Sequence, residues 1–435
     1  MESYRCYRFH QRHDAEHHGY ILAATNQEVL IWSLMHPISA ILGSVALLLL
    51  GSGLLNTLLS LTASEQGFST AWIGIIMSAY FVGFASGIFV SGRLIRRIGH
   101  IRTFAFCAAL CASIALIHGL WVDQWLWLLL RFVYGMAHVT LMTVIESWLN
   151  TRAVKEERGR IFAVYMVVNL GAIALAQQLL NLNPASLFIL FSVSAIFSCW
   201  ALLPITITSR SQPHIPERAN SSLKKLLEFA PLAVATSALS GLAMGAFWGM
   251  APFYASELGF SFSEVGMLMS LTIVGGALLQ IPIGRFSDKH DRRKVLIYVA
   301  ALASLMCLLM PLAPDNNILM GLFFIWGGLS FALYPLGVAQ LLDQLHPDEV
   351  VSGSTDMLVL HGGGAALAPI FVGLLMNTVG IQGMPLYMAV ILALLALYAL
   401  YQIRHVSVLT VGEPAHFEPM VQSSHEIIEM IEKES

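Results

Sequence analysis

The sequence predicts an all-α, polytopic membrane protein whose twelve transmembrane helices form two six-helix bundles of the same orientation. Of the 435 residues, 57% are hydrophobic and 11% are charged, which is about half the charged share of an ordinary soluble domain. Apolar runs near or above 18 residues recur along the chain, and each is long enough to cross a hydrocarbon layer about 30 Å thick. Because backbone polar groups in lipid must be satisfied within the segment, each run should be a helix.

The expected spans cover the chain between its polar ends. They lie at 38–62, 71–94, 103–122, 125–149, 160–180, 185–206, 231–254, 263–286, 295–313, 317–341, 354–377 and 384–402. The five cysteines have no spacing that indicates a disulfide framework, and four of them lie inside apolar spans, so we interpret them as small packing residues.

An internal repeat divides the spans into two sets of six. The stretch ASEQGFS at 63–69 returns as ASELGFS at 255–261, and a gap-free shift of 192 residues makes 14 of 31 positions identical between 63–93 and 255–285. The same shift pairs Gly135 with Gly327. Since each unit has an even number of spans, both should cross the membrane in the same sense and be related by an axis along the membrane normal.

Lysine and arginine indicate the orientation. They gather before the first span and in every second connection, whereas the predicted external loops hold no basic residue and carry Glu65, Asp123, Glu257 and Asp315. Basic loops stay in the cytoplasm, so both termini should be cytoplasmic. The expected domains are an N-terminal extension at 1–37, a bundle at 38–207, a polar linker at 208–230, a second bundle at 231–403 and a tail at 404–435.

Two loops carry a recognisable motif. The segment GRFSDKHDRRK at 284–294 resembles the signature loop of the major facilitator superfamily, and GRLIRRIGHIR at 92–102 is its diverged repeat, with Arg96 in the acidic position. The segment RFVYGMA at 131–137 is similar to that family's Arg-x-x-x-Gly element. The longer stretch from there into the fifth span resembles the YcaD-type bacterial branch.

The resemblance implies secondary transport of a small solute across the bacterial inner membrane by alternating access. In this mechanism the two bundles would rock about a central binding site near the midplane of the membrane. The fifth span lacks the Gly-x-x-x-Gly-Pro pattern that is usual in proton-driven drug exporters of the family, which disfavours a drug antiporter. We expect a monomer in the lipid bilayer, with protons as a possible coupling ion. We expect no enzymatic activity, cofactor, metal site or nucleic-acid partner.

Polar residues of the fourth span should line the site. At about 100° per residue, Arg131, Gly135, His138, Met142 and Glu146 fall within an arc of roughly 80°. Arg131 would bind an anionic group or tune a proton carrier, unless it reaches outward to the membrane surface. Ionisable groups in a span are functional candidates by default, although Glu146 could instead form a structural clamp with Arg97, Arg158 or Arg160.

Histidines and uncharged polar groups complete the predicted site. His138 and His361 would carry a coupling proton or be neutral, hydrogen-bonded core residues. The remaining candidates, which are alternatively helix–helix contacts, are Asn56, Tyr80, Asn169, Gln177, Trp248, Gln280, Tyr334 and Gln340. This set favours a neutral or weakly anionic small molecule. An uncoupled facilitator and a transport-inactive membrane sensor remain alternative functions.

A charge clasp is predicted at the cytoplasmic loops. Asp288 should face Arg158 and Arg160 across the two halves, and Arg96 or Arg97 should face Asp348 and Glu349. Arg292 belongs to the same group of loop charges. The alternative is that all of these are solvated charges that only set the orientation.

Overall fold

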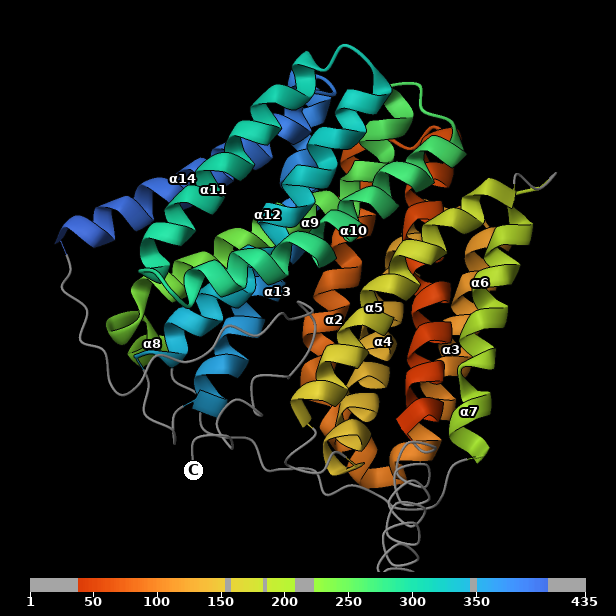
Figure 1. Ribbon diagram of the computed structural model, residues 1–435. Coiled ribbons are helices and arrows are strands. Elements are labelled where there is room, and N and C mark those ends of the chain that lie inside the picture. The colour runs from red at the N-terminus through yellow and green to blue at the C-terminus, as the bar shows by residue number, and fades with distance from the viewer. Residues whose placement is uncertain (1–37, 153–157, 183–185, 208–222, 345–349, 406–435) are drawn as a thin grey trace, which may run out of the picture.

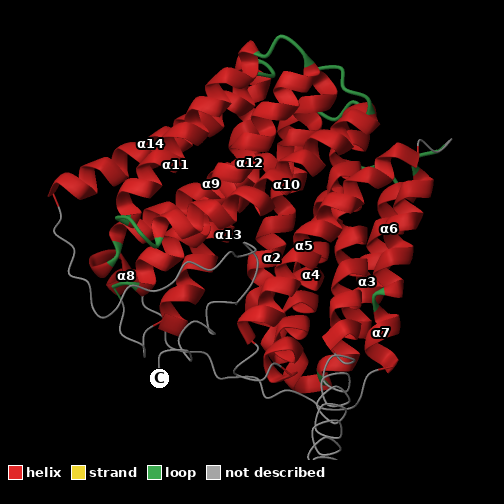
Figure 2. Cartoon of the chain, viewed as in Figure 1, coloured by secondary structure: helices red, strands yellow, loops and turns green. Residues whose placement is uncertain are grey.

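The computed structural model describes residues 38–152, 158–182, 186–207, 223–344 and 350–405. Within these ranges twelve helices are long and apolar enough to span a membrane, there is no strand (Figure 2), and each helix coincides with an expected span to within a few residues. The expected N-terminal extension, most of the linker and nearly all of the tail lie outside the described residues.

The N-terminal bundle contains six spans. They are the first helix Ile38–Glu65, α2 Thr70–Ile98, α3 His100–Leu120, α4 Gln124–Arg152, α5 Arg158–Gln178 with η1 Leu179–Leu182, and a sixth span made of α6 Phe188–Trp200 and α7 Leu202–Ile207. The C-terminal bundle begins with the short α8 Leu223–Phe229. Its six spans are α9 Pro231–Glu257, α10 Phe262–Ser287, α11 Arg292–Leu309 with η2 Met310–Leu312, α12 Asn316–Leu342, α13 Val350–Val379 and α14 Gly383–His405.

The helix starts repeat with the predicted shift of 192 residues. Ser69 caps α2, and its counterpart Ser261 caps α10 in a capping box with Glu264. Asp123 accepts a hydrogen bond from the Leu126 N–H at the start of α4, and Asp315 does the same at α12. Such side chains satisfy backbone donors that the first helical turn leaves free.

Close helix contacts repeat in the same register. Added Cβ atoms at Gly83 and Gly135 would collide with backbone oxygens of Phe132 in α4 and Tyr80 in α2. The equivalent collisions, of Gly275 with Phe324 and of Gly327 with Thr272, join α10 to α12. Small residues that let backbones approach in this way are typical of membrane helix pairs, and both pairs are assembled alike.

Replacing Gly83 with alanine should therefore lower the melting temperature of the purified protein, because overpacking of a tight contact typically costs about 1–3 kcal/mol. Gly171 in α5 is the matched control, since nothing lies within 4 Å of a Cβ at that position. Its alanine variant should melt at the same temperature or higher, because alanine favours a helix over glycine by about 1 kcal/mol. Equal melting temperatures for both variants would contradict the packing described here.

The two bundles meet at one end. We call the end with residues 64–69 and 257–261 the acidic end, and the end with the 92–102 and 284–294 segments the basic end. Figure 1 shows the bundles side by side at their acidic ends and diverging toward their basic ends. Near the acidic end, α2 packs on α13 where Gly74 meets Pro369, and α10 packs on α5 where Gly266 meets Gln177, again 192 residues apart.

Hydrogen bonds between described residues also link the bundles in this region. The Ser64 hydroxyl donates to Glu257 at 3.1 Å, the Gln178 amide donates to the Ser270 hydroxyl at 2.6 Å, and that hydroxyl donates to the Ala174 carbonyl at 2.8 Å. Together with the glycine contacts they close the acidic end of the molecule.

The basic end of the C-terminal bundle holds an ion cluster around a buried arginine. Arg292, which is 7% exposed, contacts Asp288 at 3.2 Å and Asp343 at 3.5 Å. Asp343, just past the end of α12, was not among the predicted residues. Arg96 and Arg97 are exposed at the end of α2. The side chains of Arg158 and Arg160, and all of Asp348 and Glu349, lie outside the described part, so the predicted clasp between bundles stays a prediction.

Candidate functional site

A cavity of about 180 Å³ lies between the two bundles. The first helix, α2, α4 and α5 line it on one side, and α9, α12 and α13 line it on the other. Of the residues predicted from sequence to line the site, those that reach it are Asn56, Tyr80, Arg131, His138, Met142, Asn169, Trp248 and His361. The site is therefore shared by the two repeats.

Arg131 is the cation of this cavity. Its side chain is 1% exposed, so it lies inside the protein and does not extend to the surface. One terminal nitrogen donates to the Asn56 side-chain oxygen at 2.7 Å, and the guanidinium carbon lies 4.6 Å from the centre of the Tyr80 ring. Its Nε has no hydrogen-bond partner, and among the described residues no carboxylate lies within ion-pair distance of it.

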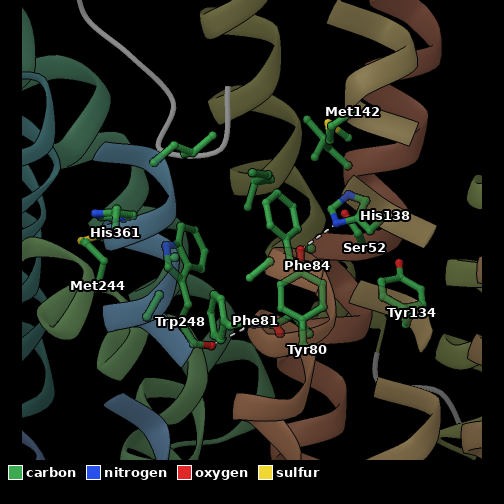
Figure 3. Close-up of a pocket in the computed structure, with 18 of the residues that line it drawn as sticks. Ser52, Tyr80, Phe81, Phe84, Tyr134, His138, Met142, Met244, Trp248 and His361 are labelled. Carbon is green, nitrogen blue, oxygen red and sulfur yellow. Dashed lines mark hydrogen bonds between the residues drawn. The ribbon is translucent and has the colours of Figure 1, made fainter. Parts of the chain in front are cut away.

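His138 lies next to Tyr80 in the cavity wall, and Figure 3 shows the hydrogen bond that joins them. The Tyr80 hydroxyl and His138 Nδ1 are 2.7 Å apart, while the buried His138 Nε2 has no hydrogen-bond partner in the part of the chain that the structure describes. Tyr134 packs beside them, with its ring centre 5.9 Å from that of His138. Its hydroxyl has no hydrogen-bond partner within the described ranges. Tyr80 thus connects Arg131, through its ring face, to His138, through its hydroxyl.

Asn169 and His361 occupy equivalent places in the two repeats, 192 residues apart. Asn169 is 1% exposed, and neither its amide nitrogen nor its oxygen has a hydrogen-bond partner among the described residues. On the opposite side of the cavity, His361 Nδ1 lies 3.1 Å from the Ser240 hydroxyl, and its ring lies 4.7 Å from that of Tyr334. His361 is therefore held by its own bundle, whereas the Asn169 amide is available to a ligand.

Most of the remaining wall is apolar. Figure 3 shows Trp248 and Met244 from the C-terminal bundle facing Phe81 and Phe84 from the N-terminal bundle, and Phe331 and Leu358 extend the same surface. The cavity consequently has a polar pole around Arg131, His138 and Asn169, and an apolar body beside it. It fits a small molecule with one polar or charged end.

Several predicted residues lie outside the cavity. Glu146 is buried and accepts a long hydrogen bond from Tyr165. Gln177 accepts from Thr57 at 2.6 Å and donates to the Gly53 carbonyl at 3.2 Å, which makes it a helix–helix contact. Tyr334 packs in a second apolar cluster behind His361. Gln280 and Gln340 are also buried away from the cavity.

The sequence reasoning missed Tyr134 and Ser52, which line the cavity. Tyr134 lies three residues after Arg131 and four before His138, so the helical spacing that selected those two would have selected it as well. Within the described residues no group of three or more His, Cys, Asp or Glu side chains is arranged to hold a metal ion.

Two pseudo-symmetric six-helix bundles around a shared central cavity are the architecture of a membrane transporter, and comparison with known proteins identifies the family. The sequence model of the protein family described as Major Facilitator Superfamily matches residues 41–236 and 233–427 of this chain. The chain belongs to this superfamily.

Similar proteins of known sequence indicate the branch of the superfamily to which the chain is related. It is 30% identical over 347 residues, 78% of this chain and 89% of the relative, to a protein of Escherichia fergusonii named uncharacterized MFS-type transporter YcaD. The Escherichia coli K12/DH10B protein of that name is 29% identical over the same length. The resemblance to the YcaD-type branch is thereby confirmed.

Solved structures share the fold. The nucleoside transporter NupG has a TM-score of 0.69 at 16% identity, covering 85% of this chain and 99% of its own. A bacterial homolog of the human lysosomal transporter Spinster has a TM-score of 0.70 at 13% identity, covering 85% of this chain and 97% of its own.

Proposed function

We propose that this protein is a secondary transporter that moves a small organic anion across the bacterial inner membrane by alternating access. The observation that carries the proposal is Arg131, a buried cation at the wall of the central cavity with no carboxylate partner among the described residues. The substrate anion would be its missing counterion.

The physical argument is the cost of burying charge. A guanidinium removed from water is unfavourable unless it is paired and hydrogen-bonded. Its planar set of donors suits a carboxylate or phosphate oxygen pair, and here Nε is free to donate. The unpartnered amide of Asn169 and hydroxyl of Tyr134 add further donors to the same pole.

The size and lining of the cavity restrict the rest of the substrate. Its volume of about 180 Å³ is below the 300–1,000 Å³ or so that is typical of sites for drug-sized ligands. The aromatic wall at Trp248, Phe81 and Phe84 would cover an apolar body. A compact monoanion with a hydrophobic or planar body fits both features better than a sugar or a metal ion.

The orientation supports alternating access. Basic loops remain cytoplasmic, so the basic end, where the bundles diverge (Figure 1), would face the cytoplasm and the closed acidic end would face outward. Rocking of the two bundles about the cavity would expose Arg131 to each side in turn.

Counterflow in proteoliposomes tests this function against a membrane sensor on the same fold. Vesicles preloaded with each member of a panel of small carboxylates receive the same compound in labelled form, and the neutral amide of each carboxylate is the matched control. We expect transient accumulation of at least one carboxylate but not of its amide. If no compound exchanges, or if amides exchange as fast as carboxylates, the proposal fails.

Proton coupling through His138 is part of the proposal. A proton on His138 adds a second positive charge beside Arg131, so an anion bound at Arg131 favours that proton and the two should move together. His138 Nδ1 bonds to Tyr80, and Nε2 has no hydrogen-bond partner among the residues that the structure describes. The ring can therefore hold a proton on each nitrogen. Glu146 and His361 have partners within their own bundles and are the weaker candidates.

A further inference from the structure

A proline in α9 leaves a backbone carbonyl without its helical donor. The helix continues from Pro231 to Glu257 through Pro252, but a proline has no N–H, so the carbonyl four residues earlier cannot make the usual bond. That carbonyl belongs to Trp248, on the cavity wall. It accepts instead from the side-chain amide of Asn56, at 2.8 Å, across the interface between the bundles.

The other end of the same amide is bonded to the cavity cation. The Asn56 oxygen accepts from Arg131 at 2.7 Å while its nitrogen donates to Trp248. Hydrogen bonds in such a chain polarise one another, so a cation on the oxygen makes the nitrogen a better donor. Arg131, Asn56 and the Trp248 carbonyl therefore form a continuous connection from the candidate anion site to the opposite bundle.

The hydrogen bond between Asn56 and Trp248 lies near the axis that relates the two bundles, which is where a link between them is expected. Residues 56 and 248 are equivalent in the two repeats, being 192 apart, and a residue that meets its own counterpart lies near the pseudo-two-fold axis. Gly249, the next residue, packs on Pro369 close to the α2–α13 contact that closes the acidic end. The other bonds between the bundles named above, at Ser64, Gln178 and Ser270, include no residue of the anion site.

We propose that Asn56 is a positioning residue that couples occupancy of the anion site to closure of the acidic end, an inference that rests on the proposed function. In the empty site, Arg131 holds Asn56, and Asn56 holds α9. An anion that takes the N–H groups of Arg131 competes with the Asn56 oxygen, weakens the bond to Trp248 and favours opening of the acidic end.

The chain contains a matched control for this bond. Pro335 leaves the Phe331 carbonyl of α12 without a helical donor in the same way, and the Gln280 amide of α10 donates to it at 3.2 Å. The chemistry is the same, but both helices belong to one bundle. Removing the Gln280 amide should therefore leave the relation between the bundles unchanged.

The test measures the separation of the acidic ends by double electron–electron resonance. Spin labels are placed at Gln66 and Asn317, which are exposed on opposite bundles, with Cys6 and Cys199 changed to serine. Without ligand, Asn56→Leu should shift the distances to longer values than in the parent, and Gln280→Leu should not. Pro252→Ala restores an N–H that competes for the Trp248 carbonyl and should shift them in the same direction as Asn56→Leu.

The ligand arm uses benzoate, with benzamide as its neutral isostere. Benzoate should lengthen the distances between the two spin labels in the parent protein. In Asn56→Leu it should still bind but cause no further lengthening. Unchanged distances in ligand-free Asn56→Leu, or an equal benzoate response in parent and variant, would overturn the inference. If Asn56→Leu does not fold, Asn56→Asp replaces it. An aspartate there pairs with Arg131 but has no amide to donate, so it should also open the acidic end.

The experiment distinguishes failure of the proposed anion site at Arg131 from failure of the proposed role of Asn56. If benzoate binds the parent no better than benzamide does and Arg131→Met changes neither, the proposed function is wrong at this site. The ligand-free comparison of Asn56→Leu with Gln280→Leu still decides whether the bond to Trp248 holds the acidic end closed.

Discussion

Replacing Arg131 with methionine should reduce transport of the anion identified by counterflow by about 30-fold or more. Losing one partner of a buried, hydrogen-bonded charge pair typically costs about 2–5 kcal/mol, and each 1.4 kcal/mol is a factor of ten in affinity. The measurement is initial uptake rate against substrate concentration in proteoliposomes. Arg131→Lys should be intermediate, because it keeps the charge but loses the planar donor set that also reaches Asn56.

Thermal stability separates this role from a structural one. Methionine has similar volume and leaves no unpaired charge in the bundle, and replacing buried charges with apolar groups is often neutral or stabilising. Arg131→Met should therefore melt at or above the temperature of the parent protein. A variant that loses transport together with a large drop in melting temperature would indicate that Arg131 serves the fold.

Replacing His138 with glutamine should abolish accumulation driven by a proton gradient while leaving counterflow of the same anion measurable. Glutamine can keep a hydrogen bond to the Tyr80 hydroxyl but cannot take up a proton, so exchange continues and coupling is lost. Uptake into proteoliposomes with and without an imposed pH gradient measures both. The expected loss is the whole gradient-dependent component.

His361→Gln is the matched control, since this histidine lines the same cavity but bonds within its own bundle. It should keep gradient-driven accumulation. If the parent shows no dependence on the gradient, or if His138→Gln keeps it, His138 carries no coupling proton and the protein is better described as an uncoupled facilitator.

The fold was predictable because its signals are local or periodic. Membrane spans follow from the length of apolar runs, and the 192-residue shift was visible in sequence before the contacts of Gly83 and Gly275 repeated it in three dimensions. The helix caps at Asp123 and Asp315 follow the same shift. Membrane proteins suit this reasoning because the bilayer allows few structures.

The site was predictable only in part, since it depends on which helices face one another. The spacing along α4 puts Arg131, His138 and Glu146 on one face, and the first two line the cavity, but the cavity ends before it reaches Glu146. Asn169 and Gln177 are similar amides on α5, yet one faces the cavity and the other bonds to the first helix. Nothing in sequence distinguishes them. The double role of Asn56 needs three helices in contact, and therefore needed the structure.

A binding cycle that combines a change in the ligand with a change in the protein tests the central claim most directly. Dissociation constants of a transported carboxylate and of its amide are measured on the parent protein and on Arg131→Met. If Arg131 contacts the carboxylate, the two changes are coupled, and the parent's preference for the anion should fall by at least about tenfold, or 1.4 kcal/mol, in the variant. An equal preference for the anion in both proteins would contradict the assignment of Arg131 as the anion's partner.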